Sequence, residues 1–285
     1  MSQVAYVNGV YAPLRGASVS ILDRGFQFAD SIYEVWAVRG GRLCDEAGHL
    51  ARLWRSLAAL RIAAPMSEAA LRAVLRETMR RNRVREGIVY LQVSRGAAPR
   101  DHGFPNPSVR PTIVVTAKHL DRRAIAARAE TGVAVISVPE SRWARRDIKS
   151  TNLLPNVLAR QAAREAGAFE AWFLDDDGLV TEGTSSNAWI VDAAGRVRTR
   201  ALSPALLHGV TRAGLLAAAH RLGLEVEERA FTIAEAQAAR EAFLSAATNP
   251  AIAVTALDGA RIGAGAVGPL TRALRGAYLG AESSE

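Results

Sequence analysis

The chain has 285 residues, of which 49% are hydrophobic and 22% are charged. These proportions are typical of globular proteins and allow either one large domain or two of ordinary size. No apolar run approaches the roughly 20 residues that a membrane-spanning helix needs, and the opening residues lack the features of a signal peptide. The single cysteine, Cys44, cannot form an internal disulfide. We therefore predict a cytoplasmic protein that has no membrane partner.

The formal net charge of +8 raises the question of nucleic-acid binding. Arginines are spread singly along the predicted helices, and acidic residues lie among them. The densest basic cluster, at residues 80–85, is typical of a solvated helix end. Basic segments interleaved with aromatic residues for base stacking are absent. The sequence therefore predicts no nucleic-acid partner.

Residues 1–120 are predicted to form an α+β domain. Asn8-Gly9 suits the turn of a first hairpin, and Gly40-Gly41 suits that of a second. Leucines 50, 53, 57 and 60 form one apolar stripe of a helix, and Ser67 suits the N-cap of the next. Strands are expected over residues 32–38, 42–44, 88–93 and 112–116, and helices over 49–60 and 68–81.

Residues 121–132 are charged and Ala-rich without clear periodicity, and we predict them as a linker. A second domain then covers residues 133–285. Its helix over residues 211–222 is followed by Gly223, which is a favourable residue just after the C-terminal end of a helix. Strands are expected over 133–138, 171–174, 179–181 and 187–191, helices over 151–166 and 211–222, and then a strand, a helix, two strands and a helix.

Only two of the 36 basic residues are lysines, Lys118 and Lys149. Arginine stays protonated, whereas a lysine amine can lose its proton and attack a carbonyl. Lys149 lies just before a predicted helix, a position that can present an amine within a cleft. For either lysine taken alone, an ordinary surface position is the alternative, and we keep that interpretation for Lys118.

Two segments have the composition of ligand-binding loops. Glu182 is followed by the small residues Gly183-Thr184-Ser185-Ser186-Asn187, which allow close approach to a ligand. An ordinary polar turn is the alternative. Gly209-Val210-Thr211 begins a predicted helix, where backbone N–H groups and a hydroxyl favour phosphate binding. Thr211 could equally serve only as an N-cap.

Two further segments carry groups that suit a ligand. Residues 245–250 follow a predicted strand and include hydroxyl residues, although they could equally be a plain strand end. Arg100 and His102 lie in a loop rich in Gly and Pro and suit a substrate carboxylate. Taken alone, this loop is more simply interpreted as a solvated basic loop.

The order of these segments resembles a known family. Residues 23–35 read Asp-Arg-Gly-Phe-Gln-Phe-Ala-Asp-Ser-Ile-Tyr-Glu-Val, similar to the opening signature of class IV (fold type IV) aminotransferases. The segments at Lys149, Glu182 and Gly209-Val210-Thr211 follow in the family's order and at about its spacing, which is far more specific than one short motif. The resemblance covers nearly the whole chain.

The resemblance implies a mixed α/β fold of two domains, with a barrel-like sheet in the larger C-terminal domain. Pyridoxal 5′-phosphate (PLP) would lie between the domains, and no metal ion is expected. Lys149 would form the Schiff base and carry the proton, and Glu182 would keep the pyridine nitrogen protonated, which makes the ring a better electron sink. The other implied cofactor-binding residues are Arg52, Ser186, Asn187, Gly209, Val210, Thr211, Ala247 and Thr248.

Arg100 and His102, together with Tyr33, resemble the carboxylate-binding residues of D-amino-acid aminotransferases. In those enzymes the Arg and His come from the partner subunit of a homodimer. We therefore expect ping-pong transamination between a D-amino acid, such as D-alanine, and a 2-oxo acid, such as 2-oxoglutarate. The alternatives are branched-chain L-amino-acid transamination and 4-amino-4-deoxychorismate lyase activity, whose enzymes share the Lys, the Glu and the phosphate site, and (R)-amine transamination. Phe26, Ala29 and Ala247 depart from the commonest family sequence and bear on the substrate preference more than on the reaction.

A protein that carries PLP without catalysis, or a decayed homologue, is an alternative from another class. In a homologue that had lost its activity, mutation would have replaced at least one of the residues implied for chemistry or cofactor binding. The complete set of Lys149, Glu182, Arg52 and Thr211 therefore favours an enzyme.

Overall fold

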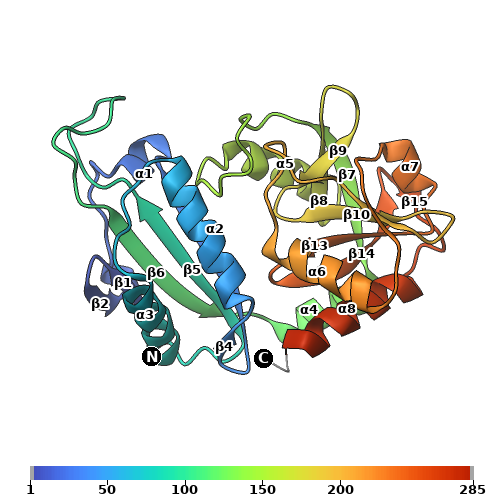
Figure 1. Cartoon of the computed structure of the whole chain (residues 1–285), viewed down its shortest axis with the longest axis horizontal. Helices are drawn as coiled ribbons and strands as arrows, with labels where there is room; N and C mark the ends of the chain where they lie inside the picture. The colour runs from blue at the N-terminus through green and yellow to red at the C-terminus, as the bar shows by residue number, and fades with distance from the viewer. Residues whose placement is uncertain (1–2, 283–285) are drawn as a thin grey trace. The chain divides into compact units, whose positions relative to one another are not determined.

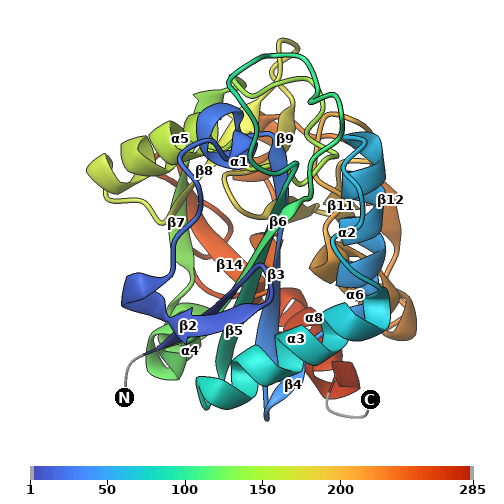
Figure 2. The ribbon, with the colours of Figure 1, turned by 90° about the vertical axis from the view of Figure 1, so that its left-hand side faces the viewer.

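The structure is a computed structural model that describes residues 3–282. The chain forms two compact units, which are coloured by residue number in Figures 1 and 2. Unit 1 contains the residues up to Asp121 together with Ile148–Asn152, and unit 2 contains Arg122–Asp147 and the residues from Leu153 onward. Within residues 3–282, no helix has the length and apolar character needed to cross a membrane.

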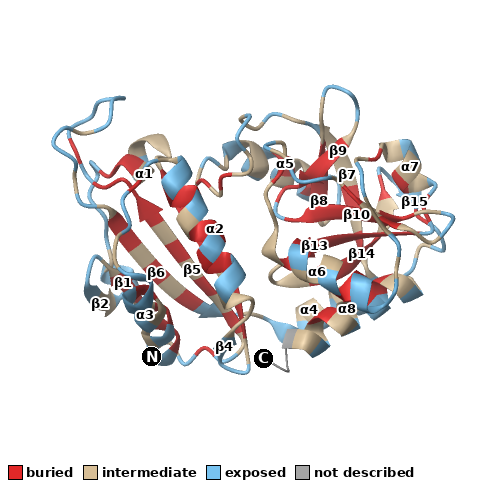
Figure 3. Ribbon diagram, in the orientation of Figure 1, coloured by how far each residue is buried: buried red, intermediate tan, exposed pale blue. Residues whose placement is uncertain are grey.

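Unit 1 is built on a six-stranded antiparallel sheet with the order β2-β1-β6-β5-β3-β4. Successive side chains of a strand point to opposite faces, so Val89, Leu91 and Val93 of β5 are buried on one face. Figure 3 shows this alternation as bands along β5 and β6. The strands are β1 (Val4–Val7), β2 (Val10–Pro13), β3 (Ser31–Arg39), β4 (Arg42–Leu43), β5 (Gly87–Ser94) and β6 (Thr112–His119).

The helices of unit 1 follow the predicted apolar stripes. Leu50, Leu53 and Leu57 of α2 are buried, although this helix begins at Glu46, earlier than predicted. α3 has the predicted bounds, and its N-cap Ser67 accepts a hydrogen bond from the backbone N–H of Ala70 at 3.3 Å. The elements are η1 (Leu14–Gly16), α1 (Arg24–Phe28), α2 (Glu46–Ala59) and α3 (Glu68–Arg81).

A short segment far along the chain completes unit 1. Ile148–Asn152 pairs with the start of β3, where Ser150 forms an isolated bridge with Ile32. The backbone N–H of Tyr33 donates to the carbonyl of Lys149 at 3.0 Å. Lys149 therefore lies beside β3, even though more than 100 residues separate them in sequence.

Unit 2 contains a nine-stranded sheet with the order β12-β11-β10-β13-β14-β7-β8-β9, and β15 pairs with β14. β7 is parallel to both β8 and β14. β9, at one end of this order, also packs beside β10, so the sheet curls back on itself. The strands are β7 (Val133–Pro139), β8 (Glu170–Leu174), β9 (Val180–Gly183), β10 (Asn187–Val191), β11 (Val197–Thr199), β12 (Val226–Glu228), β13 (Glu241–Ala246), β14 (Asn249–Leu257) and β15 (Ala260–Arg261).

Apolar clusters on the curled sheet attach the helices of unit 2. One buried cluster includes Trp172 and Phe231. Another packs Trp189 and Phe243 against α6 and α8, and Ala163 of α5 packs beside β8. The helices are α4 (Arg122–Thr131), α5 (Leu154–Glu165), α6 (Val210–Arg221), α7 (Ile233–Gln237) and α8 (Pro269–Glu282).

Residues 121–132, which we predicted as a linker, contain helix α4 (Arg122–Thr131). None of its residues is buried, and only Ala129 packs against an apolar cluster. An Ala- and Arg-rich segment forms a helix readily through intrinsic propensity. Without a buried apolar stripe it shows no periodicity that would reveal the helix in the sequence.

Candidate active site

Lys149 is held in unit 1 with its amine beside an aromatic ring. Its Nζ lies 4.1 Å from the ring centroid of Tyr33, and the Tyr33 ring stacks on that of Tyr90 at 5.8 Å. The backbone N–H of Lys149 donates to the Ser56 hydroxyl at 3.3 Å. The structure therefore places two predicted site residues, Lys149 and Tyr33, in direct contact.

Arg52, the predicted phosphate-binding arginine, forms a buried ion pair in unit 1. Its Nε donates to Glu34 Oε1 at 2.7 Å and its Nη2 to Glu34 Oε2 at 2.8 Å. His49 Nδ1 lies 2.8 Å from Glu34 Oε2. His49 and Arg52 are three residues apart on α2, so they share one face of the helix. Neither Glu34 nor His49 was predicted as a site residue. Phosphate binding by Arg52 stays a prediction.

Arg52 and His49 set the protonation of Glu34. Burial raises the pKa of Glu34, but the charge and hydrogen bonds of Arg52 and the hydrogen bond with His49 outweigh it and lower the pKa to about 2. Burial lowers the pKa of His49, so its ring is neutral at pH 7. The ionised carboxylate therefore ties β3 to α2 at neutral pH.

Replacing Glu34 with glutamine is expected to lower the free energy of unfolding by about 3 kcal/mol at pH 7, because Arg52 would be left buried without its counter-charge. The pKa of Glu34 is lower in the folded protein than its ordinary value of 4.5. Its stabilisation is therefore present above about pH 4.5 and is lost as the pH falls toward 2. Urea unfolding at several pH values should show the difference from wild type shrinking over that range.

Glu77→Gln is the matched control for this prediction. The pKa of Glu77 is also lowered to about 2, by hydrogen bonds from Arg80 and Arg81. These three residues form ion pairs on the surface of α3, where solvent screens them. Little change in stability is expected for this variant. Equal losses from the two substitutions would contradict the importance of burial for Glu34.

Arg100 and His102 lie on an exposed loop of unit 1, between β5 and β6. Both side chains contact the ring of Phe28. The guanidinium carbon of Arg100 lies 5.1 Å from that ring centroid, and the His102 ring lies 5.4 Å away in an edge-to-face arrangement. The structure therefore brings these two predicted substrate-binding residues together on one aromatic ring.

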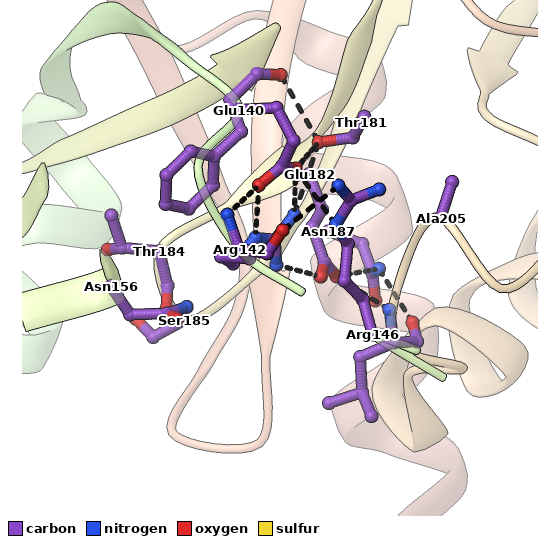
Figure 4. Close-up of polar contacts among 12 residues, drawn as sticks. Glu140, Arg142, Arg146, Asn156, Thr181, Glu182, Thr184, Ser185, Asn187 and Ala205 are labelled. Carbon is purple, nitrogen blue, oxygen red and sulfur yellow. Dashed lines mark hydrogen bonds and ion pairs between the residues drawn. The ribbon is translucent and has the colours of Figure 1, made fainter. Parts of the chain in front are cut away.

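Glu182 is buried at the end of β9 in unit 2, where several hydrogen-bond donors surround its carboxylate (Figure 4). Oε1 accepts from Arg142 Nη1 at 2.5 Å. Oε2 accepts from Asn187 Nδ2 at 3.2 Å and from the backbone N–H of Leu207 at 3.0 Å. These donors fix the orientation of the carboxylate and favour its ionised form.

Arg142 is shared between Glu182 and a second carboxylate, Glu140. Its Nε donates to Glu140 Oε1 at 2.9 Å and its Nη2 to Glu140 Oε2 at 2.6 Å. Thr181 also donates to Glu140, at 3.1 Å. Arg142 and Glu140 were not predicted as site residues, because one arginine among the many in this chain carries no local signal.

The small residues after Glu182 are organised by another buried carboxylate, Glu170. Thr184 Oγ1 and the backbone N–H of Ser185 donate to Glu170 Oε1 at 2.9 and 2.6 Å, and Ser186 Oγ donates to Oε2 at 2.9 Å. The predicted cofactor-binding Ser186 is therefore held by Glu170, a residue that was not predicted as part of the site. These hydrogen bonds give the loop a defined shape rather than that of an ordinary solvated turn.

The predicted phosphate segment forms the start of α6. Gly209 is the N-cap, and no side chain caps the helix there. The Thr211 hydroxyl oxygen is buried and has no hydrogen-bond partner within the described part of the chain, residues 3–282. α6 packs against β13 and β14, and Ala247 and Thr248 form the connection between those strands. An uncapped helix start with an unpartnered hydroxyl fits a phosphate group.

Comparisons with known proteins identify the family of this chain. The family model described as amino-transferase class IV matches residues 31–257. A D-alanine aminotransferase of Bacillus licheniformis is 41% identical over 278 residues, covering 98% of this chain and 96% of the relative. Another, from Staphylococcus haemolyticus, is 35% identical over 271 residues, covering 95% of this chain and 94% of the relative.

Solved structures share the fold. The branched-chain amino acid aminotransferase of Escherichia coli superposes with a TM-score of 0.91 at 22% identity, covering 98% of this chain and 94% of that one. A hypothetical aminotransferase from Mycobacterium tuberculosis, solved in its PLP-bound form, has a TM-score of 0.84 at 25% identity, covering 99% of each chain. The fold is thus that of a fold type IV, PLP-dependent enzyme. The chain belongs to the class IV aminotransferase family.

Proposed function

We propose that this aminotransferase moves the amino group of a D-amino acid, such as D-alanine, to a 2-oxo acid, such as 2-oxoglutarate, in a ping-pong reaction. The observation that carries the proposal is the similarity, over nearly the full length of both chains, to relatives named D-alanine aminotransferases. The contact of Arg100 and His102 with one ring supports it, since a guanidinium and an imidazole held together can both donate hydrogen bonds to a carboxylate.

The proposed function assigns each of these residues a role toward PLP or toward the substrate proton. Bound PLP supplies an electron sink for the electron pair left when a proton leaves the substrate carbon. Lys149 Nζ would hold the cofactor and then carry that proton, and Tyr33 lies against this amine. Glu182 would accept a hydrogen bond from the pyridine nitrogen, and the unpartnered Thr211 Oγ1 and the first N–H groups of the uncapped α6 would bind the phosphate.

We also propose a cytoplasmic homodimer in which Arg100 and His102 serve the partner subunit's site. Their exposure supports this assignment, because an exposed loop can reach another chain. Large exposed apolar side chains also support an interface, among them Ile21 and Phe26 at 77% and 73% exposure. The single cysteine is half-buried and free, as expected for a reducing compartment.

Replacing Gly209 with alanine is expected to weaken PLP binding by at least tenfold, on the order of 1.4 kcal/mol. A Cβ at this position would lie 2.0 Å from Asn187 Oδ1, so Asn187 would have to move away from Glu182. A fluorescence titration with PLP gives the dissociation constant. Gly276→Ala on α8, where a Cβ meets open space, is the matched control and should leave binding unchanged. A similar change in both variants would contradict the prediction.

The test of function is the visible absorbance spectrum of the PLP-loaded protein. D-alanine, L-alanine, L-leucine and (R)-1-phenylethylamine are added in separate samples, each without a 2-oxo acid. We expect D-alanine alone to convert the yellow enzyme rapidly to the pyridoxamine phosphate form, and 2-oxoglutarate to reverse the change.

The other outcomes each exclude part of the proposal. Conversion by L-leucine would indicate a branched-chain L-aminotransferase, and conversion by the amine an (R)-amine transaminase. Release of pyruvate from 4-amino-4-deoxychorismate would indicate the lyase. In all three cases the assignment of Arg100 and His102 to a D-amino-acid carboxylate would be wrong.

A further inference from the structure

Arg24, the first residue of α1, is buried and connects this helix to the exposed loop that carries Arg100 and His102. Its Nε donates to Asp30 Oδ2 at 2.8 Å. Its Nη1 donates to the carbonyl oxygen of Asp101 at 2.6 Å, and its Nη2 to that of His102 at 3.3 Å. One guanidinium thus holds two consecutive carbonyls of the loop.

The ring of Phe28, the last residue of α1, is the second contact between this helix and the loop. The guanidinium carbon of Arg24 lies 4.9 Å from the ring centroid. Arg100 and His102 contact the same ring, at 5.1 and 5.4 Å. An exposed loop loses conformational freedom only where such contacts restrict it. Arg24 and Phe28 therefore restrict both the backbone and the side chains of this segment.

Asp30 keeps Arg24 oriented. Burial raises the pKa of Asp30, but hydrogen bonds from Arg95 and Arg24 outweigh it, so the pKa lies below its usual value and the carboxylate is ionised at neutral pH. Arg95 binds the same carboxylate through Nε and Nη2, at 2.7 and 2.9 Å. Arg95 also donates to the carbonyls of Leu60 and Arg61, at the end of α2.

We propose that Arg24 is a positioning residue for substrate recognition, and that it fixes the loop so that Arg100 and His102 reach the substrate carboxylate together. This inference rests on the proposed function of those two residues. The planar fork of a guanidinium can serve a carboxylate and two carbonyls at once, whereas the compact ammonium of lysine cannot span these acceptors. The loop conformation, and with it carboxylate affinity, therefore depends on arginine at position 24.

The test compares Arg24→Lys with wild type in the PLP-loaded enzyme. The probe is propionate, which has the carboxylate of D-alanine but no amino group, and its dissociation constant is measured by calorimetry. We expect this constant and the KM for D-alanine to rise about tenfold, the effect of one displaced charge-assisted contact, while kcat changes less than about twofold. The visible absorbance of bound PLP should stay unchanged, which shows that the cofactor site is intact.

Two further variants keep the test decisive. Arg198→Lys alters another largely buried guanidinium, which pairs with Asp192 and Glu227 within unit 2, and should leave propionate binding within about twofold of wild type. Phe28→Leu removes the ring from the second contact and should weaken propionate binding as Arg24→Lys does. It serves as the test if Arg24→Lys does not fold. Equal effects of Arg24→Lys and Arg198→Lys would overturn the proposal, because the loss would then not depend on contacts with the loop.

Arg100→Ala separates this inference from the proposed function. If Arg100→Ala leaves propionate binding unchanged, the assignment of the loop to the substrate carboxylate is wrong, and the role of Arg24 is wrong with it. If Arg100→Ala weakens binding and Arg24→Lys does not, the function stands and only the positioning role of Arg24 is overturned.

Discussion

Replacing Lys149 with alanine is expected to lower the rate of transamination by at least 10³-fold, since on the order of 10² to 10⁴ comes from a positioned acid or base alone. The Nζ of this lysine is held beside the Tyr33 ring, and its backbone is fixed against β3 and Ser56. Alanine has no amine, so it can neither bind the cofactor covalently nor carry the proton. Activity with D-alanine and 2-oxoglutarate measures the loss.

Because the chain has only two lysines, attachment of the cofactor to Lys149 can be checked directly. Reduction of the PLP-loaded protein with borohydride, followed by peptide mass analysis, should place the cofactor on the peptide that contains Lys149. Lys118 is exposed at the end of β6, so Lys118→Ala is the natural control and should keep full activity. Label on Lys118, or activity retained by Lys149→Ala, would contradict the assignment.

Replacing Glu182 with glutamine is expected to lower kcat by about 10² to 10³, the size of effect seen when one preorganised electrostatic contact is removed from a buried site. The carboxylate accepts hydrogen bonds from Asn187 and from the backbone of Leu207, which fix its direction. Glutamine keeps the size of the side chain but loses the charge that, in the proposed function, would stabilise a protonated pyridine nitrogen. Steady-state kinetics with D-alanine give the change in kcat.

Glu140→Gln is the matched control for Glu182→Gln. Both variants remove one carboxylate from the same guanidinium, that of Arg142. Only Glu182 is proposed to contact the cofactor. Similar losses of stability are therefore expected from the two variants, together with a much smaller loss of kcat for Glu140→Gln. Equal losses of kcat would mean that Arg142, rather than Glu182, determines the rate.

Local pattern was sufficient to predict much of the fold. The bounds of α3 and its Ser67 cap follow from an apolar stripe and one hydroxyl, both of which lie within a few turns of chain. The curled sheet of unit 2 was implied by the resemblance, since strand periodicity alone does not set the order of strands. α4 was missed because a helix with no buried residue has no apolar stripe to detect.

The partners of the site residues could not be predicted in the same way. Arg142 and Glu182 are 40 residues apart, and Arg24 and Asp101 are 77 apart. Contacts at such separations depend on how the strands are ordered, and no local spacing encodes them. The chain also uses arginine almost wherever it needs a cation, so the functional arginines look like the solvated ones. Lys149 was recognisable because lysine is rare in this chain.

The order in which the chain is synthesised has a consequence for unit 1. Ile148–Asn152 completes this unit beside β3, although β7 of unit 2 precedes it in the chain. On the ribosome, the first 121 residues emerge without this segment and leave the start of β3 exposed. Domains generally fold as units during synthesis, but here the first unit must wait until part of the second has emerged. The last piece of unit 1 to be synthesised is the one that carries Lys149, so this lysine can reach its position only after the rest of that unit has emerged.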